Sequence, residues 1–317
     1  MIKEILFIVL GFVLLIKGAD FLVDGASSVA KRFRIPEIVI GLTIVSIGTS
    51  MPELFVSTTS ALQGSADMSI GNIIGSNICN LLLILGLSAV ISPVAFQKAT
   101  RNIEIPMCFG ITVIFMLLAN IGGTLSLLDG IILLVLFAGF IAYTLYVAKK
   151  GRTEAEEEQE AEGEKKNSIL KDIILIVVGI VGLKIGGDLT VNNSVVIAEA
   201  VGISEKVIGL TILAIGTSLP ELVTSVVAAI KGNDDIAIGN IIGSNIFNML
   251  MIIGVTAVIT PLNFNISYNM QLGILLFALI LLEIFAFTKP KDKMTRFNGA
   301  IYVALYAAFM AMLFVIG

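Results

Sequence analysis

The sequence predicts an all-α membrane protein with about ten transmembrane helices, arranged as two inverted five-helix repeats with broken helices at the core. Three observations lead to this prediction: the hydrophobicity of the chain, an internal duplication, and two prolines inside apolar segments. The chain has 317 residues, of which 57% are hydrophobic and 14% are charged, and its mean hydropathy is +1.01. A soluble core of ordinary size cannot hide so much apolar surface, which indicates a lipid bilayer.

Apolar segments of roughly 20 residues, the length of a membrane-spanning helix, recur along nearly the whole chain. Continuous apolar runs favour helices over an outer-membrane barrel, whose short strands would alternate apolar and polar residues. Histidine is absent, and the two cysteines, Cys79 and Cys108, lie far apart inside apolar segments. We therefore expect no zinc, copper or iron site, no disulfide and no cofactor. The expected surroundings are lipid, with no nucleic acid as a partner.

An internal duplication organises the chain. The segment Ile40–Glu53 returns almost unchanged as Ile208–Glu221, and the segment Ile70–Asn80 returns as Ile238–Asn248. Both pairs have the same offset along the chain, so the two halves derive from one ancestral unit. The duplication predicts a first repeat at residues 1–148 and a second, inverted repeat at residues 169–317.

Residues 149–168 form the predicted linker between the repeats. This segment contains the acidic run Glu154–Glu160 and has no apolar periodicity, so we expect it to be solvated. It lacks the carbonyl and glycine pattern of a calcium-binding loop, which disfavours a regulatory calcium site there.

The basic residues predict the orientation in the membrane. One set of alternate loops carries nearly all the lysines and arginines outside the apolar segments, whereas the other set has only Lys3 and Lys206. Basic loops stay in the cytoplasm, so we expect a multi-pass protein of the inner (plasma) membrane with both termini outside and a cytoplasmic linker. An odd number of helices per half inverts the second repeat, an arrangement typical of secondary transporters with a substrate site near the midplane.

Each copy of the first duplicated segment ends in Gly-Thr-Ser-x-Pro-Glu, which predicts a broken helix. Pro52 and Pro220 lack an N–H, and their rings clash with the carbonyl group four residues earlier. A broken helix within a membrane is tolerated where its free carbonyl groups line a cavity or coordinate a ligand. Oxygen-bearing side chains lie within one turn of each predicted break: Thr49, Ser50 and Glu53 in the first half, and Thr217, Ser218 and Glu221 in the second.

The segment after each break carries a polar stripe at a spacing of four residues, which can complete a shell of oxygen ligands. A lone carboxylate at the bilayer centre costs about 2.5 to 3.5 kcal/mol, so Glu53 and Glu221 indicate a functional site. Two carboxylates with neutral oxygens suit calcium, which takes about 6 to 8 oxygen ligands, and they also suit sodium. The stripes consist of Asn72, Ser76 and Asn80 with Asn77 beside them, and of Asn240, Ser244 and Asn248 with Asn245 beside them.

Other features of these segments have structural explanations. The Gly-x-x-x-Gly patterns that begin at Gly71 and Gly239 favour close helix packing as well as site formation. Asp20 follows Lys17 by three residues and Asp188 follows Lys184 by four, so we expect local ion pairs at these aspartates in preference to ion binding.

At these residues the chain resembles the sodium/calcium exchanger family, in its prokaryotic form, within the calcium/cation antiporter superfamily. Two Gly-Thr-Ser-x-Pro-Glu motifs, each followed by Gly-Asn-x-x-Gly-Ser-Asn, carry the resemblance, which covers essentially the whole length. It implies ten helices, of which the second, third, seventh and eighth form the core while the first and sixth slide across it. Some prokaryotic relatives and the potassium-dependent exchangers carry aspartate where this chain has Asn248, so the chain follows the potassium-independent pattern.

The resemblance also implies a set of metal ligands, all of them side-chain or backbone oxygens. The implied calcium ligands are Glu53, Glu221, Thr49 and Thr217; the implied sodium sites use Ser50, Ser76 and the Ser46 carbonyl on one side and Ser218, Ser244 and the Ala214 carbonyl on the other; and Asn80 and Asn248 border the middle.

We therefore expect an antiporter, not an enzyme, that works as a monomer and exports calcium in exchange for sodium by alternating access. A calcium/proton antiporter is an alternative, because two nearby carboxylates can bind protons instead of sodium. A broader cation/calcium exchanger is another. An intramembrane hydrolase is disfavoured because the chain has no histidine base and Asp20 and Asp188 lack protease motifs. Inverted symmetry around a closed carboxylate site disfavours a passive channel.

Overall fold

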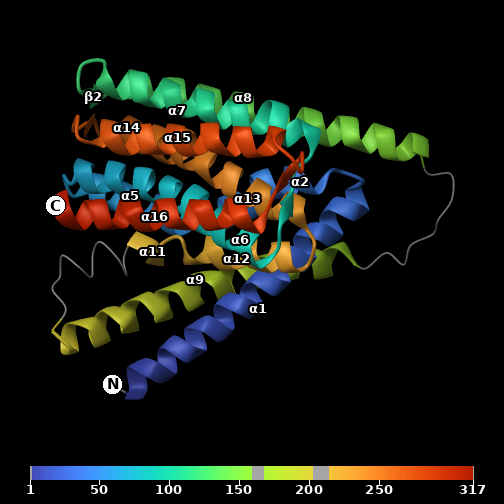
Figure 1. The fold of residues 1–317 in the computed structure, drawn as a ribbon, viewed down its shortest axis with the longest axis horizontal. Helices are drawn as coiled ribbons and strands as arrows, with labels where there is room; N and C mark the ends of the chain where they lie inside the picture. Colours follow the sequence, from blue (N-terminus) through green and yellow to red (C-terminus); the bar gives the residue numbers. More distant parts are fainter. Residues whose placement is uncertain (1, 159–167, 203–213, 317) are drawn as a thin grey trace.

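The protein is a layered assembly of helices joined by short turns, and the computed structural model describes residues 2–158, 168–202 and 214–316 (Figure 1). The elements of the first half are α1 (Ile2–Phe33), α2 (Glu37–Ile40), the π-helix η1 (Gly41–Val45), α3 (Ser46–Thr49), α4 (Met51–Leu62), α5 (Ala66–Ile78), η2 (Cys79–Leu85), α6 (Gly86–Ile91), β1 (Val94–Ala95), η3 (Thr100–Glu104), α7 (Ile105–Asn120), β2 (Thr124–Leu125) and α8 (Leu127–Glu158). Those of the second half are α9 (Ile169–Ala200), α11 (Ala214–Gly216), α12 (Leu219–Ile230), α13 (Asp234–Phe247), η5 (Asn248–Ile252), α14 (Ile253–Ile259), β3 (Leu262–Asn263), α15 (Tyr268–Phe287), β4 (Lys293–Met294) and α16 (Arg296–Ile316).

The apolar helices confirm the predicted class, an all-helical membrane protein. Within the described residues, 7 helices are long and apolar enough to cross a membrane, or up to 8 if a bent pair counts as one span. The predicted count of ten stays a prediction, because residues 203–213, which precede α11, lie outside the described part of the chain.

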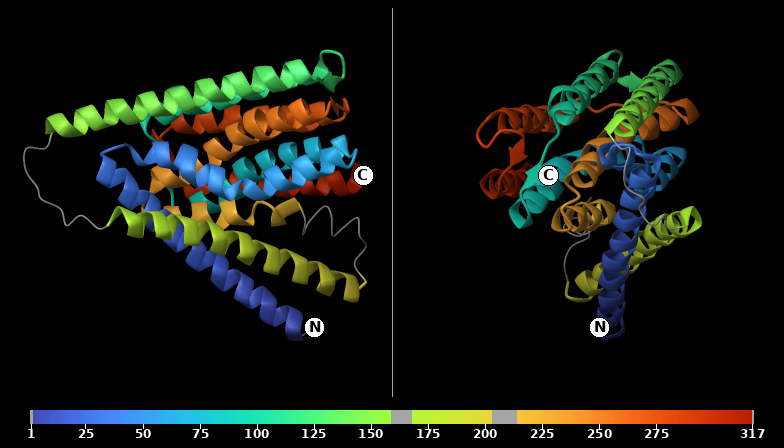
Figure 2. Two further views of the ribbon diagram at one scale, coloured as in Figure 1. Left: turned by 180° about the vertical axis from the view of Figure 1, so that it is seen from behind. Right: turned by 90° about the vertical axis from the view of Figure 1, so that its right-hand side faces the viewer.

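α1 and α9 pack against each other on one side of the molecule, and the C-terminal part of α1 also contacts α12 (Figure 2). A Cβ atom added to Gly18 would lie 2.8 Å from the carbonyl oxygen of Gly179, and one added to Gly11 would lie 2.8 Å from that of Gly186. Residue numbers rise along α1 from Gly11 to Gly18 while those of their partners fall from Gly186 to Gly179, so the two helices are antiparallel. The missing side chains allow the backbones to approach this closely, as in many membrane helix pairs.

The predicted break at Pro52 is confirmed. α2, η1 and α3 run from Glu37 to Thr49, and their direction differs by 48° from that of α4. Pro52 lies in the first turn of α4, where no intrahelical N–H bond is lost. In the second half, Pro220 likewise lies in the first turn of α12.

Elements from the two halves alternate in the centre of the fold. Among the candidate spans, α5 with its continuation to Ile91 and α13 with its continuation to Ile259 are the most buried. Two short antiparallel ribbons join the halves at the ends of the helices, because β1 pairs with β4 and β2 pairs with β3. The polar stripes of α5 and α13 are therefore held inside the bundle.

The region of the predicted linker differs in part from the expectation. α8 continues to Glu158 because its alanine, lysine and glutamate residues are good helix formers. The rest of the acidic run, in residues 159–167, lies outside the described residues. The start of α1 and the end of α16 lie at one end of the bundle, and the end of α8 and the start of α9 lie at the other (Figure 1).

Candidate ion-binding site

Two buried carboxylates, Glu53 in α4 and Glu221 in α12, form the centre of the candidate site. Each side chain is only 1% exposed. The Ser50 hydroxyl donates to Glu221 Oε1 at 2.9 Å, and the Ser218 hydroxyl donates to Glu53 Oε1 at 3.4 Å. Each carboxylate thus accepts a hydrogen bond from a hydroxyl of the other half.

Polar groups of α13 extend this centre toward the first half. The Thr49 hydroxyl lies 3.0 Å from Asn240 Oδ1 and 3.3 Å from the carbonyl oxygen of Ser46. The Ser244 hydroxyl lies 3.5 Å from the same Ser46 carbonyl. The Asn240 amide in turn donates to the Ser225 hydroxyl at 2.9 Å. Residues from both halves of the sequence therefore share one polar region.

Several oxygens in this region are buried and have no hydrogen-bond partner in the part of the chain that the structure describes. Buried polar atoms are nearly always paired, so a cluster of unpaired oxygens calls for a ligand that accepts lone pairs. A cation is such a ligand. The unpaired atoms among the predicted site residues are Glu53 Oε2, Ser76 Oγ, Asn80 Oδ1, Thr217 Oγ1, Glu221 Oε2 and Asn248 Oδ1.

The structure brings most predicted site residues together. Ala214 is the first residue of α11, directly after the residues that the structure does not describe, so the surroundings of its carbonyl stay a prediction. Two serines were missed by the sequence reasoning: Ser57 accepts a hydrogen bond from Asn72 at 3.0 Å, just as Ser225 does from Asn240. Their equal positions in the two repeats were the signal that could have identified them.

The site is bordered by two π-helical segments that the sequence patterns did not predict. η2 spans Cys79–Leu85 and η5 spans Asn248–Ile252, so by the duplication their first residues differ by one position. π-Helical turns are uncommon and frequently occur at functional sites. Here they contain the last residue of each polar stripe, Asn80 in η2 and Asn248 in η5.

The charged groups Asp20 and Asp188 have lysine partners. Lys17 lies 3.7 Å from Asp20 and Lys184 lies 2.5 Å from Asp188, which confirms the predicted ion pairs. Lys231 also contacts Asp20, at 3.2 Å.

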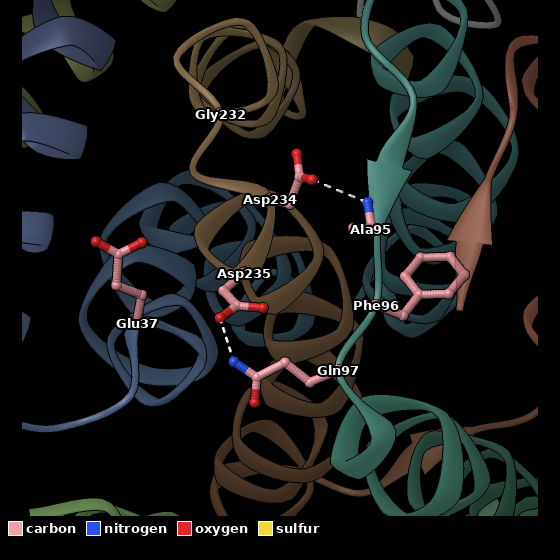
Figure 3. Close-up of a pocket in the computed structure, with 7 residues that line it drawn as sticks. All are labelled: Glu37, Ala95, Phe96, Gln97, Gly232, Asp234 and Asp235. Atoms are coloured by element: carbon pink, nitrogen blue, oxygen red, sulfur yellow. Dashed lines mark hydrogen bonds between the residues drawn. The ribbon is translucent and has the colours of Figure 1, made fainter. Parts of the chain in front are cut away.

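A surface pocket of about 210 Å³ lies away from the two glutamates and contains three further acids, Glu37, Asp234 and Asp235 (Figure 3). The backbone N–H of Ala95 donates to Asp234 at 3.0 Å, and the Gln97 amide donates to Asp235. In the described residues, no group of three or more His, Cys, Asp or Glu side chains is arranged to hold a metal. The donors around Glu53 and Glu221, two carboxylates with neutral oxygens, are of the kind that a hard cation prefers.

Apolar membrane helices with paired acids and unpaired oxygens in their core are typical of cation transporters. The chain belongs to the sodium/calcium exchanger family, because the family model described as "Sodium/calcium exchanger protein" matches residues 3–146 and again residues 171–315.

Relatives and solved structures agree with this membership. The chain is 32% identical over 346 residues to the sodium/calcium exchanger MaX1 of Methanosarcina acetivorans, with 98% of each chain covered. It is 40% identical over 264 residues to the putative antiporter CaxA of Alkalimonas amylolytica, with 82% of each covered. A structure of the sodium-calcium exchanger NCX_Mj matches with a TM-score of 0.83, 34% identity and 98% of each chain covered.

Proposed function

We propose that this protein exports calcium across the plasma membrane in exchange for sodium by alternating access. The observation that carries the proposal is the reciprocal pairing of Ser50 with Glu221 and of Ser218 with Glu53, deep within the bundle. Two acids that share one buried region repel each other unless a cation neutralises them. Calcium matches their combined charge, and sodium ions can replace it at the same oxygens.

Coupling between the two ions follows from this electrostatic requirement. An uncompensated carboxylate at the bilayer centre is unfavourable by about 2.5 to 3.5 kcal/mol even on lenient scales. The carrier therefore changes its facing direction readily with Glu53 and Glu221 neutralised and rarely without. Since calcium and sodium compete for one set of oxygens, the gradient of sodium drives calcium the other way.

We assign the ligands by their place around the two acids. The unpaired oxygens described above support this assignment, since each can face a cation without breaking a protein hydrogen bond. The proposed central calcium site uses Glu53, Glu221, Thr49 and Thr217; the proposed flanking sodium sites use Ser50, Ser76 and the Ser46 carbonyl, and Ser218, Ser244 and the Ala214 carbonyl; Asn80 and Asn248 border the middle.

An inverted repeat of two five-helix halves supplies the two access states. The double match of the family model supports it. The contact between α1 and α9 supports it too. In the duplication Gly11 and Gly18 are equivalent to Gly179 and Gly186, and in the structure Gly11 faces Gly186 while Gly18 faces Gly179. We propose that α1 and α9 move as a pair over the core formed by α3 to α6 and α11 to α14. One chain holds both halves, so a monomer suffices.

For orientation, we propose that both termini face outward and that residues 149–168 lie in the cytoplasm. The basic loops support this, and the start of α1 and the end of α16 lie together at the end of the bundle opposite the end of α8 (Figure 1).

The test is calcium uptake into proteoliposomes that contain the purified full-length protein. With sodium inside and none outside, uptake of radioactive calcium is expected, and it should stop when sodium is equal on both sides. An equal uptake driven by a pH gradient alone would favour calcium/proton antiport. Uptake that needs neither gradient would overturn the proposal. The matched control variant is E104Q, because Glu104 is a buried acid that accepts a hydrogen bond from Tyr143 outside the site.

A further inference from the structure

Four asparagines, two from each half, meet where α5 and its continuation pass α13. Asn77 and Asn80 come from the first half and Asn245 and Asn248 from the second, and all four side chains are buried. The Asn77 amide nitrogen donates to the backbone carbonyl of Asn245 at 3.1 Å, and the Asn245 amide nitrogen donates to the backbone carbonyl of Asn77 at 3.3 Å. Each of these two side chains thus binds the backbone of the helix that carries the other.

These two bonds determine which way both amides face. A backbone carbonyl only accepts, so the side-chain atom directed at it must be nitrogen. The side-chain oxygens of Asn77 and Asn245 are then fixed as acceptors on the other side of each amide. Asn248 donates to Asn77 Oδ1 at 2.9 Å, and Asn80 donates to Asn245 Oδ1 at 3.1 Å.

The chain of bonds consequently determines the orientation of Asn80 and Asn248 as well. Their nitrogens are used within the network, and their Oδ1 atoms are the ones without a hydrogen-bond partner in the described residues. Asn80 follows Ser76, whose hydroxyl is also unpaired, by one helical turn. The network therefore leaves oxygen, and never nitrogen, available on the side where an ion needs lone pairs.

We propose that Asn77 and Asn245 are positioning residues, which hold the side-chain oxygens of Asn248 and Asn80 toward the transported cation. This inference rests on the proposed function. It also explains why an amide suits position 248: a carboxylate there would place a second acceptor against Asn77 Oδ1, and Asn77 could not rotate without losing its bond to the Asn245 carbonyl.

The test is a set of double-mutant cycles on calcium binding to the purified full-length protein in sodium-free detergent solution. N77A and N248A are each expected to weaken calcium binding by about tenfold, a usual effect of losing a ligand or the group that orients it. Because Asn77 acts through Asn248, the double variant N77A/N248A should be no weaker than either single variant. N77A/N80A loses the Asn80 oxygen as well as the group that orients Asn248, so it should bind calcium more weakly than either single variant.

The reciprocal cycle, N245A with N80A, repeats the test from the other half if one of the first variants does not fold. T256A is the matched control, because Thr256 is buried in α14 and donates to its own helix at Ile252. A purely structural role would lower the melting temperature and give the same coupling for every pair. If the effects of the two substitutions multiply in N77A/N248A just as they do in N77A/N80A, the inference is overturned. Unchanged calcium binding in N77A would also overturn it. Either result leaves the proposed function standing. Absence of calcium binding by the wild-type protein would overturn the proposed function and this inference together.

Discussion

The hydroxyl of Ser50 donates a hydrogen bond of 2.9 Å to the carboxylate of Glu221, which belongs to the other half of the chain. The equivalent pair, Ser218 and Glu53, is arranged in the same way at 3.4 Å. Each acid therefore depends on the opposite half for its orientation. Binding of a cation at these acids acts on both halves at once, which is what a carrier needs to link occupancy to its facing direction.

Substitution of Ser50 by alanine is expected to raise the sodium concentration for half-maximal exchange by about tenfold, since the change removes a proposed sodium ligand and the hydrogen bond to Glu221. The measurement is sodium-dependent release of radioactive calcium from proteoliposomes. S88A is the control, because Ser88 is equally buried but lies in α6, outside the site. An unchanged sodium dependence in S50A would count against the proposed ligand set.

The contact between α1 and α9 predicts a separate effect on transport rate. A methyl group at Gly18 would lie 2.8 Å from the Gly179 carbonyl, so G18A must push the two helices apart. We expect exchange to slow by about tenfold or more while calcium affinity stays the same, because neither residue touches the site. In G139A the new methyl group meets no neighbour within 4 Å in the described residues, so this variant should behave like wild type. Equal rates in G18A and wild type would argue against this contact.

Lys231, at the end of α12, contacts Asp24 of α1 at 2.8 Å and Asp20 at 3.2 Å. If α1 moves across the core, a covalent link at this place should stop transport. A short thiol cross-linker applied to the double variant Asp24→Cys/Lys231→Cys is expected to abolish exchange, which a reducing cleavage should restore. Each single cysteine variant is the control, and the native Cys79 and Cys108 are buried. Full exchange by the cross-linked protein would rule out motion of α1 relative to α12.

A largely buried ion pair joins the last turn of α1 to the first turn of α9. Arg32 lies 3.1 Å from Asp172, which is 1% exposed and also accepts from Ser28 at 2.9 Å. Removing one partner of a buried pair costs about 3 to 5 kcal/mol. D172A is therefore expected to lower the melting temperature in detergent by roughly 5 to 10 °C. The control, D67A, removes an exposed acid at the start of α5 and should have little effect; an equal loss in both variants would contradict this role.

Much of the candidate site could be predicted from the sequence, because its motifs occur once in each half of the duplication. The prolines, the acids and the polar stripes are local patterns, so Pro52 predicts its break and Glu53 its burial without knowledge of the fold. The ion pairs of Asp20 and Asp188 were likewise predictable from spacing on one helix.

Contacts between the halves could not be read from such patterns. The bonds of Asn77 to Asn245 depend on how α5 and α13 cross, and nothing in either segment specifies that crossing. The continuation of α8 to Glu158 was missed because an acidic run without apolar periodicity is compatible with either a helix or a solvated coil.

The proposed exchange of calcium for sodium depends most directly on the binding of calcium by Glu53 and Glu221. Equilibrium binding of radioactive calcium to the purified protein in sodium-free solution tests it, with E53Q, E221Q and the control E104Q measured beside wild type. We predict that wild type and E104Q bind calcium equally and that E53Q and E221Q bind at least about a hundredfold more weakly, since each loses a buried charge partner of the ion. Wild-type affinity in E53Q or E221Q would contradict the account.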